Sequence, residues 1–544
     1  MRDDAAPGPL THGSAARAGG GHELSPGGTK LFRCKRGTYV DSIRVMSATR
    51  KMLDSPGVEW AAALMRTPAG LEELARRGFV GVELDGAGAN DLLLAVEAPS
   101  PAQAEAAMAA AEDLLAAAAP PQPAALKAPR TVREAMAALP RANLSLISVP
   151  GPYAVLEAHR ALSAGMHVLL FSDNVALEAE AELKARAAEL GLLVMGPAAG
   201  TAMVGGIGLG FANVVRRGQV GVVAASGTGA QEVMCLLDRW GAGISHVLGV
   251  GGRDLSGEVG GRMAMLAIGV LDADEQTEVV VLVSKPPAPE VARSLLSRMG
   301  KKPAVAGMLG LERGRNEVGP LAPPGVRVCG SLEAAAAVSL SLLGLPAPRP
   351  EVGLAARAAT AIARLRSQPR AVRGLFSGGS LCHEAMLLLC RQLGPLHSNV
   401  PLRPEWALPA PPGAHVFLDL GEEEFTRGRP HPMIDPESRL QLVGEAARDP
   451  DTAVILLDVV LGHGSHPNPA GVLAPACREA CARPDGPAVV AYVLGTDRDP
   501  QRYTEQRAQL ENAGCLVAPT AARAALLAGA VAARRPEIAE ETVA

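Results

Sequence analysis

Aromatic residues are scarce in this sequence of 544 residues, because Phe, Trp and Tyr together make up only 3% of it. Hydrophobic residues still reach 48%, as in an ordinary globular protein, which excludes a largely disordered chain. With so few aromatic rings, the core must be built from Ala, Val, Leu and Ile. The length predicts three to four domains.

A large excess of charge of either sign is also lacking. The chain has 52 basic and 56 acidic side chains and a formal net charge of -4. It shows no basic stripe with interleaved aromatic residues, which is the usual footprint of a nucleic-acid-binding surface. We therefore expect no nucleic-acid partner.

Long apolar runs are absent as well. Runs such as Val279–Val283 and Ala453–Leu457 are bounded by charge, Pro or Gly and are too short to span a bilayer. The N-terminus carries Arg2, Asp3 and Asp4 but no apolar segment of the kind found in signal peptides or anchors. Eight scattered cysteines are typical of reduced thiols rather than of a disulfide framework. These patterns predict a cytoplasmic protein that does not associate with a membrane.

Clusters of Pro and Gly divide the chain into segments. Residues 1–29 lack periodicity and are predicted to be a disordered arm, and a Pro-rich break follows at Ala118–Arg130. We interpret residues 344–371 as a linker and residues 534–544 as a short acidic tail. The breaks leave three folded blocks, at residues 30–117, 131–343 and 372–533.

The first block alternates short strands with helices. Gly37–Ser42 is predicted to open it as a strand, and further strands are expected at Val58–Met65 and Asp91–Glu97. Helices are expected at Pro68–Arg77 and Ser100–Ala117. The pattern favours a small α/β sandwich, of which the ferredoxin-like fold is one form.

The middle block has the continuous apolar runs of buried parallel strands, with amphipathic helices between most of them. It predicts two doubly wound sheets that divide near Gly218, giving domains at residues 131–217 and 218–343. The expected strands are Leu144–Pro150, His167–Phe171, Leu192–Gly196, Gln219–Ala225, Ser245–Gly251, Val279–Ser284 and Ala304–Met308.

The third block repeats the plan of the second sheet. Gly221–Met234 and Gly374–Met386 both run from a strand through Ser-Gly and a short polar turn into a helix with Glu-x-Met. Further along, Thr277–Ser284 matches Thr452–Val459, where a polar lead-in precedes a buried strand. The two matches indicate an internal duplication.

The two Ser-Gly turns are candidate anion sites. Glycines let the backbone approach a ligand, and the free N–H groups and dipole of the following helix favour a phosphate or carboxylate. The alternative is that these residues are ordinary helix caps in tight turns, and with two copies the sequence leaves both interpretations open. The candidate residues are Ser226, Gly227, Thr228, Gly229, Ser377, Gly378, Gly379 and Ser380. The Gly249–Asp254 segment closes another strand and is open to the same two interpretations.

The third block also gathers polar side chains that a purely structural domain does not need. His463 is the candidate titrating group, with Asp458 to orient it. Both belong to the Asp458–Pro467 segment, which follows a buried strand and is expected to lie near the Ser377–Ser380 turn at the carboxyl edge of one parallel sheet. Each histidine is individually also typical of a surface or packing position. His463-x-x-His466 lacks a further ligand pair, so we predict no metal site, and Cys477 and Cys481 are expected to be small buried thiols. The other candidate substrate-binding residues are His397, Ser398, Asn399, His431, Asp435 and His466.

These motifs carry a family resemblance. Residues 131–343 resemble the α subunit of succinyl-CoA synthetase through Val149–Tyr153, Gly196-Pro197, Gly221–Thr228 and Gly249–Gly252. The whole chain apart from its ends resembles the FdrA family. That second resemblance rests on Gly37–Ser42, Phe376–Cys382, His397–Leu402, His431–Asp435 and Asp458–Pro467.

The resemblance implies a CoA-binding-like Rossmann domain at residues 131–217 and two flavodoxin-like, ligase-type domains at residues 218–343 and 372–533. FdrA proteins are described as acyl-CoA synthetase-like. Some are thought to be subunits of a carbamoyltransferase that acts on oxalurate in allantoin breakdown. The resemblance thus implies a small anionic substrate, other enzyme subunits as partners, and CoA or a nucleotide as the cofactor.

Two departures from the synthetase pattern limit what carries over. Succinyl-CoA synthetases relay phosphate through a histidine, but this chain has no histidine between His246 and His383. The corresponding segment, Gly307–Gly319, carries Glu312, Arg313, Arg315 and Glu317 instead, and the Gly-rich CoA loop of the first Rossmann half is missing. Three hypotheses follow: a ligase-like subunit without a phosphohistidine, a subunit of an oxalurate (oxamate) carbamoyltransferase, and a non-catalytic scaffold.

Overall fold

The chain divides between residues 126 and 127 into two units, and this division falls inside the Pro-rich break. The computed structural model describes residues 29–38, 40, 42–79, 91–116, 129, 131–310, 322–349, 351–365, 371–426 and 430–543. Most of the predicted arm, Tyr39, Asp41 and the four charged residues from Glu312 to Glu317 lie outside these described residues.

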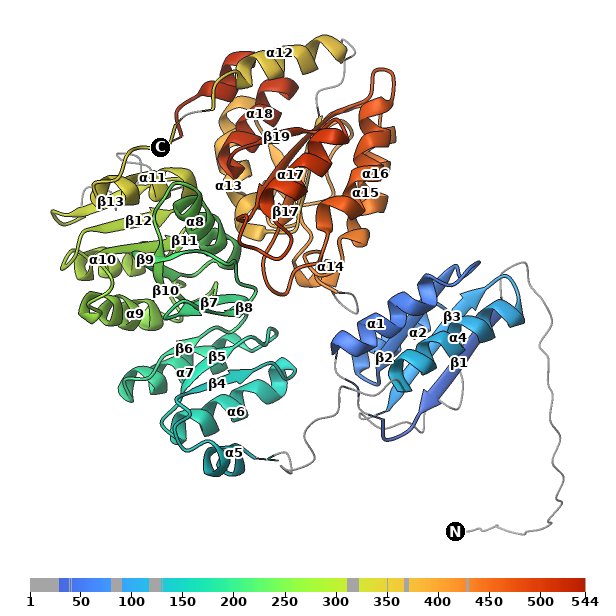
Figure 1. Ribbon diagram of the computed structural model, residues 1–544, viewed down its shortest axis with the longest axis horizontal. Coiled ribbons are helices and arrows are strands. Elements are labelled where there is room, and N and C mark those ends of the chain that lie inside the picture. Colours follow the sequence, from blue (N-terminus) through green and yellow to red (C-terminus); the bar gives the residue numbers. More distant parts are fainter. Residues whose placement is uncertain are drawn as a thin grey trace, which may run out of the picture. The chain divides into compact units, whose positions relative to one another are not determined.

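The first unit is an antiparallel sheet with helices on both faces (Figure 1). Its strands are β1 (Thr29–Lys35), β2 (Trp60–Met65) and β3 (Leu92–Ala98), in the order β1-β3-β2, and its helices are α1 (Ser42–Leu53), α2 (Pro68–Arg76) and α4 (Pro101–Ala116). In β3, Leu92, Leu94 and Val96 pack against α1 and α4, whereas Leu93 and Ala95 join Leu74 of α2. Because side chains alternate across a strand, covering both faces requires the unbroken apolar run of β3.

The predicted first strand at Gly37–Ser42 is wrong. The strand lies earlier, at Thr29–Lys35, where it pairs antiparallel with β3 from Thr29↔Ala98 to Lys35↔Leu92. Gly37 instead has φ +61° in the turn that follows, and Ser42 begins α1. The Gly37 backbone N–H donates to the Asp91 carboxylate at 2.6 Å, which fixes the turn against the start of β3.

The second unit begins with a small parallel sheet in the order β4-β5-β6. Its elements are α5 (Val132–Ala138), β4 (Leu144–Ile147), α6 (Gly151–Ser163), β5 (His167–Leu170), α7 (Leu177–Glu189) and β6 (Val194–Met195). A hairpin of β7 (Thr201–Val204) and β8 (Ile207–Gly210) comes next and pairs through β7 with β10 of the following sheet. The predicted division near Gly218 therefore falls after a hairpin that already belongs to the second sheet.

Two larger sheets repeat one topology, as the sequence duplication predicts. The seven-stranded sheet has the order β13-β12-β11-β9-β10-β7-β8, and the six-stranded sheet has the order β15-β16-β14-β17-β18-β19. The first contains β9 (Arg217–Ala224), α8 (Gly227–Arg239), β10 (Ile244–Gly249), α9 (Arg262–Ala273), β11 (Val279–Ser284), α10 (Pro289–Arg298), β12 (Ala304–Met308), β13 (Val326–Cys329) and α11 (Leu332–Leu342). The run β13-β12-β11-β9-β10 corresponds to β19-β18-β17-β14-β16, strand for strand.

The second half follows the linker helix α12 (Leu354–Arg364). Its strands are β14 (Ala371–Phe376), β15 (Leu396–Ser398), β16 (His415–Asp419), β17 (Thr452–Val460), β18 (Ala488–Leu494) and β19 (Leu516–Ala518). Its α-helices are α13 (Gly379–Leu393), α14 (Glu423–Thr426), α15 (Leu440–Arg448), α16 (Pro469–Ala482), α17 (Tyr503–Asn512) and α18 (Ala521–Ala533). Short 3₁₀ helices lie at Pro404–Trp406, Pro436–Arg439 and Pro536–Glu540.

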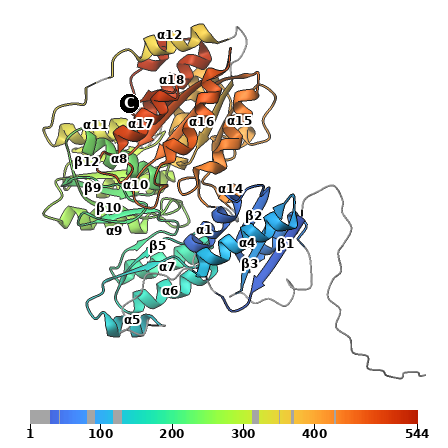
Figure 2. The ribbon, with the colours of Figure 1, turned by 45° about the vertical axis from the view of Figure 1, so that its right-hand side comes forward.

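The two larger sheets share one core. Helices α8 and α11 of the first half pack against α13 and α18 of the second, and one continuous apolar cluster runs through all four (Figure 1). Helices α15, α16 and α17 cover the outer face of the six-stranded sheet, and Figure 2 shows α15 and α16 side by side there. The fold is thus a mixed α/β architecture with Rossmann-like parallel sheets, as predicted, and its duplicated halves meet helix to helix.

Candidate functional site

The two Ser-Gly turns face each other where the halves meet. The hydroxyl oxygens of Ser226 and Ser380 lie 2.5 Å apart, and the Ser380 N–H donates to the Thr228 hydroxyl at 3.4 Å. Each turn follows the central strand of its sheet, β9 or β14, and starts the helix that packs against the other half. The duplication therefore brings two helix N-termini together, although they are separated by about 150 residues of sequence.

The second turn is filled by a carboxylate of the protein itself. Asp458 accepts hydrogen bonds from the Ser377 N–H at 2.7 Å, the Ser377 hydroxyl at 2.9 Å and the Gly378 N–H at 2.7 Å. Arg439, only 1% exposed, donates to the same carboxylate at 2.8 Å and to the Asp458 carbonyl oxygen at 2.7 Å. The predicted proximity of the Asp458–Pro467 segment to this turn is confirmed, but Asp458 lies within β17 and occupies donors that an anion would need.

The first turn has no such internal partner. Ser226 is the N-cap of α8, and its hydroxyl accepts from the Gly229 N–H at 3.0 Å. Among the described residues, no acceptor forms a hydrogen bond with the Gly227 or Thr228 N–H. Gly227 is also the one exposed residue in an otherwise buried stretch, so its backbone faces solvent.

At four other helix N-termini of this unit, a buried carboxylate accepts hydrogen bonds from the backbone. Asp458 serves α13, and Asp254 accepts from the Met263 and Ala264 N–H groups of α9. Glu232 of α8 accepts from the Ala521 N–H of α18 at 3.3 Å, and Glu384 of α13 accepts from the Leu332 N–H of α11 at 2.7 Å. Each of the duplicated glutamates thus serves a helix of the other half.

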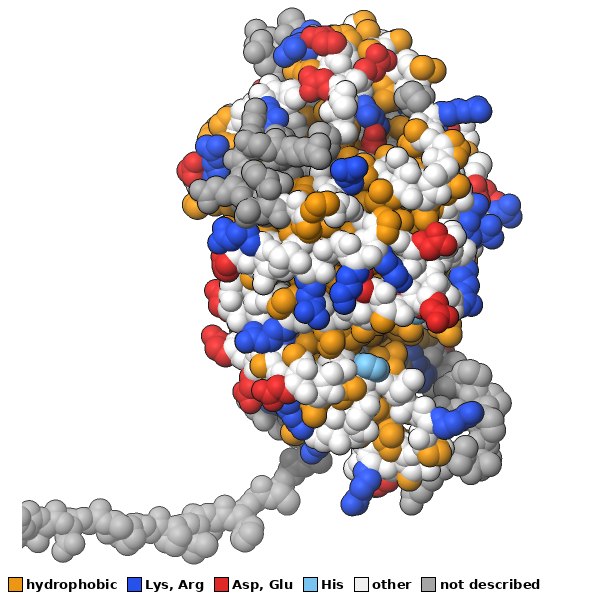
Figure 3. Space-filling model, turned by 90° about the vertical axis from the view of Figure 1, so that its left-hand side faces the viewer, with side chains coloured by type: hydrophobic (Ala, Val, Ile, Leu, Met, Phe, Trp, Pro, Cys, Tyr) orange, Lys and Arg blue, Asp and Glu red, His pale blue; other side chains and the backbone are white. Residues whose placement is uncertain are grey.

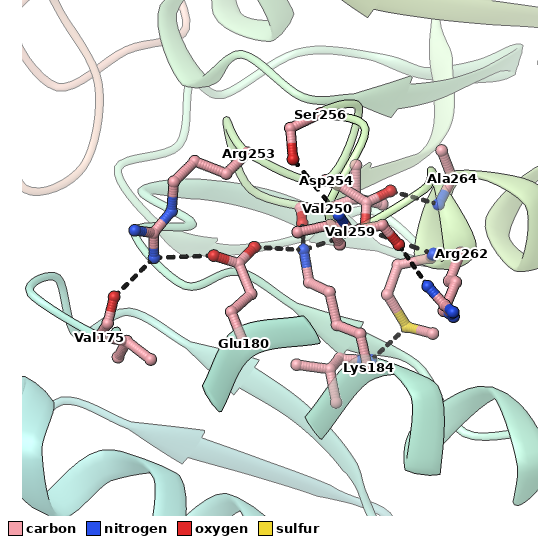
Figure 4. A network of polar contacts seen from close by, with 12 residues as sticks. Val175, Glu180, Lys184, Val250, Arg253, Asp254, Ser256, Val259, Arg262 and Ala264 are labelled. Carbon is pink, nitrogen blue, oxygen red and sulfur yellow. Dashed lines mark hydrogen bonds and ion pairs between the residues drawn. The ribbon is translucent and has the colours of Figure 1, made fainter. Parts of the chain in front are cut away.

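Asp254 belongs to a buried ionic network (Figure 4). The Lys184 ammonium, fully buried, contacts Glu180 at 2.8 Å, Asp254 at 2.9 Å and the Val250 carbonyl oxygen at 2.8 Å. Arg253 joins Glu180 at 2.7 Å. Because every buried charge is paired, the network fastens the loop after β10 to α7 of the small sheet.

The glycines of that loop are used mainly for internal packing. A Cβ at Gly249 would lie 2.2 Å from the Thr201 carbonyl oxygen, and one at Gly251 would lie 2.7 Å from that of Pro197. Gly252 is different, because it is exposed and open, and a Cβ there would lie 3.9 Å from the Ala225 carbonyl oxygen. Gly227 and Gly252 therefore both offer exposed backbone close to Ala225.

Asp419 lies beside the second turn at the end of β16. A side chain at Gly379 would come within 2.1 Å of the Asp419 carboxylate, so only glycine fits there. Burial raises the pKa of Asp419 to about 6, against the opposing effect of the Lys285 charge. The Asn399 side chain pairs with the Asp419 backbone at 2.9 and 3.0 Å and holds this strand end in place.

Other predicted site residues support this region without contacting the turns. His431 accepts from the Met433 N–H at 3.2 Å, and burial lowers its pKa to about 4, so its ring is neutral at pH 7. The Asp435 carboxylate accepts from the Glu437 N–H and caps the 3₁₀ turn that carries Arg439. The Ser398 hydroxyl accepts from the Val400 N–H at 3.0 Å, and His397 lies nearby at the edge strand β15.

His463 is exposed and is placed by its backbone, which pairs with Ala212 of the first half at 2.8 Å. The expectation that Asp458 orients His463 is wrong, because the Asp458 carboxylate is bound by Arg439 and the second turn. The His466 ring accepts from the N–H of Asn468 at 3.0 Å, and Asn468 is the N-cap residue of α16. Its role in binding and that of His463 in catalysis stay predictions.

The sequence patterns do not single out three further residues of this region, Arg439, Asp419 and Lys285. Asp419 ends a parallel strand, so the rule that ligands bind at carboxyl strand ends could have selected it. Lys285 follows β11 in the same way, close enough to act on the pKa of both Asp419 and His383. Arg439 gives no sequence signal, because its importance comes from a partner 19 residues away in the chain.

Comparison with known proteins adds a family to this geometry. Residues 375–531 match the CoA-ligase family, and residues 29–130 match the family described as AllF, heavy metal-associated domain. The YahF protein of Escherichia coli K12 is 40% identical over 504 residues, which cover 91% of this chain and 97% of that protein. The chain belongs to the YahF family.

The YahF-family chain also has relatives of known activity over part of its length. Subunit alpha 2 of the ADP-forming succinate–CoA ligase of Archaeoglobus fulgidus is 30% identical over 203 residues, which cover 36% of this chain and 64% of that subunit. The crystal structure of PH0766 from Pyrococcus horikoshii OT3 matches 77% of this chain and 89% of that one, at 16% identity and a TM-score of 0.31. The predicted similarity to succinyl-CoA synthetase α subunits is confirmed.

Charge is mixed on the face of the molecule drawn in Figure 3, where basic and acidic side chains are interspersed. No described helix is long and apolar enough to cross a membrane. Within the same residues, no cluster of three or more His, Cys, Asp or Glu side chains could hold a metal ion.

Proposed function

We propose that this YahF-family chain is a CoA-ligase-type enzyme subunit that binds a small phosphorylated or carboxylate substrate at the N-terminus of α8. The observation that carries the proposal is the contrast between α8 and its neighbours. Buried carboxylates occupy the N-termini of α9, α11, α13 and α18, whereas the Gly227 and Thr228 N–H groups have no described acceptor. A helix N-terminus with free donors and exposed glycine suits an anion.

The residues around this turn also fit the phosphate end of CoA or a nucleotide. Gly227, Thr228 and Gly252 would hold it, because the two glycines are exposed and a backbone without side chains admits close approach. Bound CoA would supply a thiol as acyl acceptor. The Ser226 and Ser380 hydroxyls, 2.5 Å apart, lie next to the open donors and would orient the substrate's oxygens.

A phosphohistidine relay is not part of the proposal. The two histidines that bound the histidine-free stretch are poorly suited to it. His246 accepts from the Gly205 N–H with one ring nitrogen, and its other nitrogen lies 3.5 Å from Asp274. Burial lowers the pKa of His383 to about 4, and this half-buried residue lies on α13.

A second candidate is a subunit of an oxalurate (oxamate) carbamoyltransferase, as the FdrA resemblance implies. The missing relay favours it, because in carbamoyl phosphate the carbamoyl group is already activated by its bond to phosphate, so its transfer needs no phosphoenzyme. Phosphate and the monocarboxylates oxamate and oxalurate are anions of the size that a single helix N-terminus accommodates.

The test is an assay of the purified chain, alone and with the proteins encoded beside its gene. One arm supplies CoA with acyl phosphates and measures thioester, and the other supplies carbamoyl phosphate with oxamate and measures oxalurate. Thioester formation supports the ligase-type subunit, and oxalurate formation supports the carbamoyltransferase. Binding of no phosphate, acyl phosphate, CoA or carbamoyl phosphate in either arm would leave the chain a scaffold and contradict both.

A further inference from the structure

A cavity of about 180 Å³ lies far from the candidate anion site, at the opposite edge of the six-stranded sheet. Strands β18 and β19 begin there, whereas the Ser-Gly turns lie at the carboxyl ends of the strands. The linker helix α12 forms one wall and the end of α16 the other. The residues that line the cavity include Arg357, Arg364, Cys481, Val489 and Gly514.

Three thiols lie together beside this cavity, and Cys481 is the one that lines it. Cys477 and Cys481 lie one turn apart at the end of α16, and Cys515 lies just before β19. Cys477 and Cys515 are buried, at 0% and 6% exposure, whereas Cys481 is half-buried and lines the cavity. The close approach of the two segments is visible at Gly514, where a Cβ would lie 3.1 Å from that of Cys481.

The surroundings of Cys481 favour its thiolate. The side-chain interaction with Cys515, the Val489 N–H and the Arg364 charge all lower the pKa of the Cys481 thiol, with the Cys515 interaction the largest cause. The Arg364 guanidinium also donates to the Cys481 carbonyl oxygen at 3.1 Å, which keeps its charge at the cavity wall. The pKa of Cys515 is raised instead, by its side-chain interactions with Cys477 and Cys481 and by burial. Cys481, which is accessible and favours the thiolate, thus lies next to Cys515, which favours the protonated thiol.

We propose that Cys481 is an oxidation site for small hydroperoxides and that Cys515 resolves it into a disulfide. The Cys481 thiolate attacks the terminal peroxide oxygen, so that an S–O bond forms and the O–O bond breaks. The sulfur loses two electrons, and the peroxide leaves as water or an alcohol after taking up a proton. The Cys515 thiol then attacks the sulfenic sulfur, an S–S bond forms, the S–O bond breaks, and the thiol proton leaves with the hydroxide as water.

The cross-link would join the last turn of α16 to the start of β19, opposite α12. Arg357 ties α12 to the same strand through the Val517 carbonyl oxygen at 2.9 Å, and Arg364 ties it to Cys481. Oxidation would therefore cross-link the two segments, the end of α16 and the start of β19, to which the linker helix α12 is hydrogen-bonded. The proposal does not depend on the anion site at the other edge of the sheet.

The test treats the reduced full-length protein with hydrogen peroxide at near-stoichiometric concentration. Differential alkylation and mass spectrometry then identify the oxidised cysteines. We expect a Cys481–Cys515 disulfide that a dithiol reverses, formed about tenfold faster than oxidation of Cys390, which is also half-buried but lies outside the cavity. In Cys515→Ser, the expected product is a sulfenic acid at Cys481 that dimedone traps.

Two variants separate the proposal from general thiol oxidation. Cys481→Ser should abolish the disulfide, and Cys390→Ser should leave its rate unchanged. Both are conservative changes, and the melting curve of each reduced variant establishes that it is folded. Oxidation of Cys390 or Cys34 ahead of Cys481, or a disulfide that survives in folded Cys481→Ser, would overturn the proposal.

Discussion

Asp458 takes the place of an anion in a turn whose sequence is typical of anion binding. The Ser377–Ser380 pattern predicts free backbone donors, but Asp458 accepts from two of them and is itself held by Arg439. The duplicated turn at Ser226–Gly229 has no equivalent carboxylate among the described residues. Two turns with almost the same residues therefore differ in what they can bind, and a single side chain on a neighbouring strand makes the difference.

The Asp458–Arg439 pair gives a prediction about stability. Asp458→Asn should lower the free energy of unfolding by about 3–5 kcal/mol, because it leaves the Arg439 guanidinium buried without its counter-charge. Asp435→Asn is the matched control, since that side chain caps a short 3₁₀ turn, Asn caps about as well as Asp, and the change should cost about 0.5 kcal/mol or less. Urea denaturation measures the free energy of unfolding of both variants. Equal decreases would show that the buried Asp458–Arg439 pair contributes no more to stability than the Asp435 cap.

His463 gives a prediction about activity. Its side chain is exposed and its position comes from backbone pairing with Ala212, so His463→Ala should leave the melting temperature nearly unchanged. If it is an acid or base of the assembled enzyme, the same variant should lose about 100-fold in kcat. A variant with normal specific activity but a much lower melting temperature would show that the residue is structural.

At the scale of helices and strands, the duplicated glutamates join the halves. Glu232 and Glu384 occupy matching positions in α8 and α13, and each serves a helix N-terminus of the opposite half. Burial raises the pKa of Glu232 to about 7 and that of Glu384 to about 8. Both side chains are therefore protonated in the folded protein at mildly acidic pH, where an unfolded chain would already have lost the protons.

This difference makes stability depend on pH. Between about pH 4.5 and the folded pKa values, the folded state binds more protons than the unfolded state, so stability is highest at the acidic end and falls as the pH rises. The slope should approach about 1.4 kcal/mol per pH unit for each carboxyl. Once the pH has passed both folded pKa values, the loss from this pair is complete.

The variant Glu232→Gln/Glu384→Gln should remove this part of the pH dependence, because an amide oxygen can still accept from Ala521 and Leu332. Chemical denaturation at pH 5.5, 7 and 9 measures it. We expect the double variant to gain stability relative to the natural protein as the pH rises. Parallel pH profiles for the two proteins would contradict the assignment, and Glu505→Gln, an exposed change, serves as the control.

The strands show what sequence patterns reveal at this scale. Continuous apolar runs such as Val279–Ser284 predict buried parallel strands correctly, because burial on both faces leaves no other composition. The β7–β8 hairpin was missed because its residues are Gly-rich and mostly exposed in β8, and its partner β10 lies far along the chain. The shift of β1 to Thr29–Lys35 has a similar cause, since pairing with β3 sets its register.

The candidate site was predictable only in part for a related reason. The carboxyl-edge rule placed Asp458 beside Ser377 from sequence alone. The contact between Ser226 and Ser380 depends on how two folded halves pack, and the duplication reveals that the halves are alike without revealing which faces meet. The contacts of Arg439, Glu232 and Glu384 were not predictable for the same reason, because each joins residues that only the folded structure brings together.

At the scale of the whole molecule, two copies of one sheet have diverged around a shared helical core. One copy closes its turn with Asp458, and the other leaves its turn open. The chain also lacks a histidine between His246 and His383. His246 accepts a hydrogen bond from the Gly205 N–H, and burial lowers the pKa of His383. We therefore expect this CoA-ligase-type architecture to work without a phosphohistidine.

This absence can be tested on the intact protein. Incubation with labelled ATP or GTP, with and without partner subunits, should give no acid-labile, base-stable phosphate on the chain, because Arg side chains cannot attack phosphorus. Phosphopeptide mapping identifies any label. A succinyl-CoA synthetase treated in parallel serves as the positive control, and label on His246 or His383 would contradict the account.

The central claim is that the α8 N-terminus is the open anion site, and Gly227 tests it most directly. Gly378 is a poor choice, since a side chain there would lie 3.0 Å from the Asp458 carboxylate, whereas one at Gly227 meets nothing closer than the Thr201 hydroxyl at 3.7 Å. Gly227→Ala should therefore keep phosphate binding, and Gly227→Asp should place a negative charge among the free donors.

The decisive measurement is titration calorimetry of inorganic phosphate with the natural protein, Gly227→Ala and Gly227→Asp, each checked by its melting curve. The account predicts similar Kd values for the first two and a loss of about tenfold or more for Gly227→Asp with the fold retained, or about 1.4 kcal/mol. Equal phosphate affinity in a folded Gly227→Asp variant, or no binding by the natural protein, would contradict it.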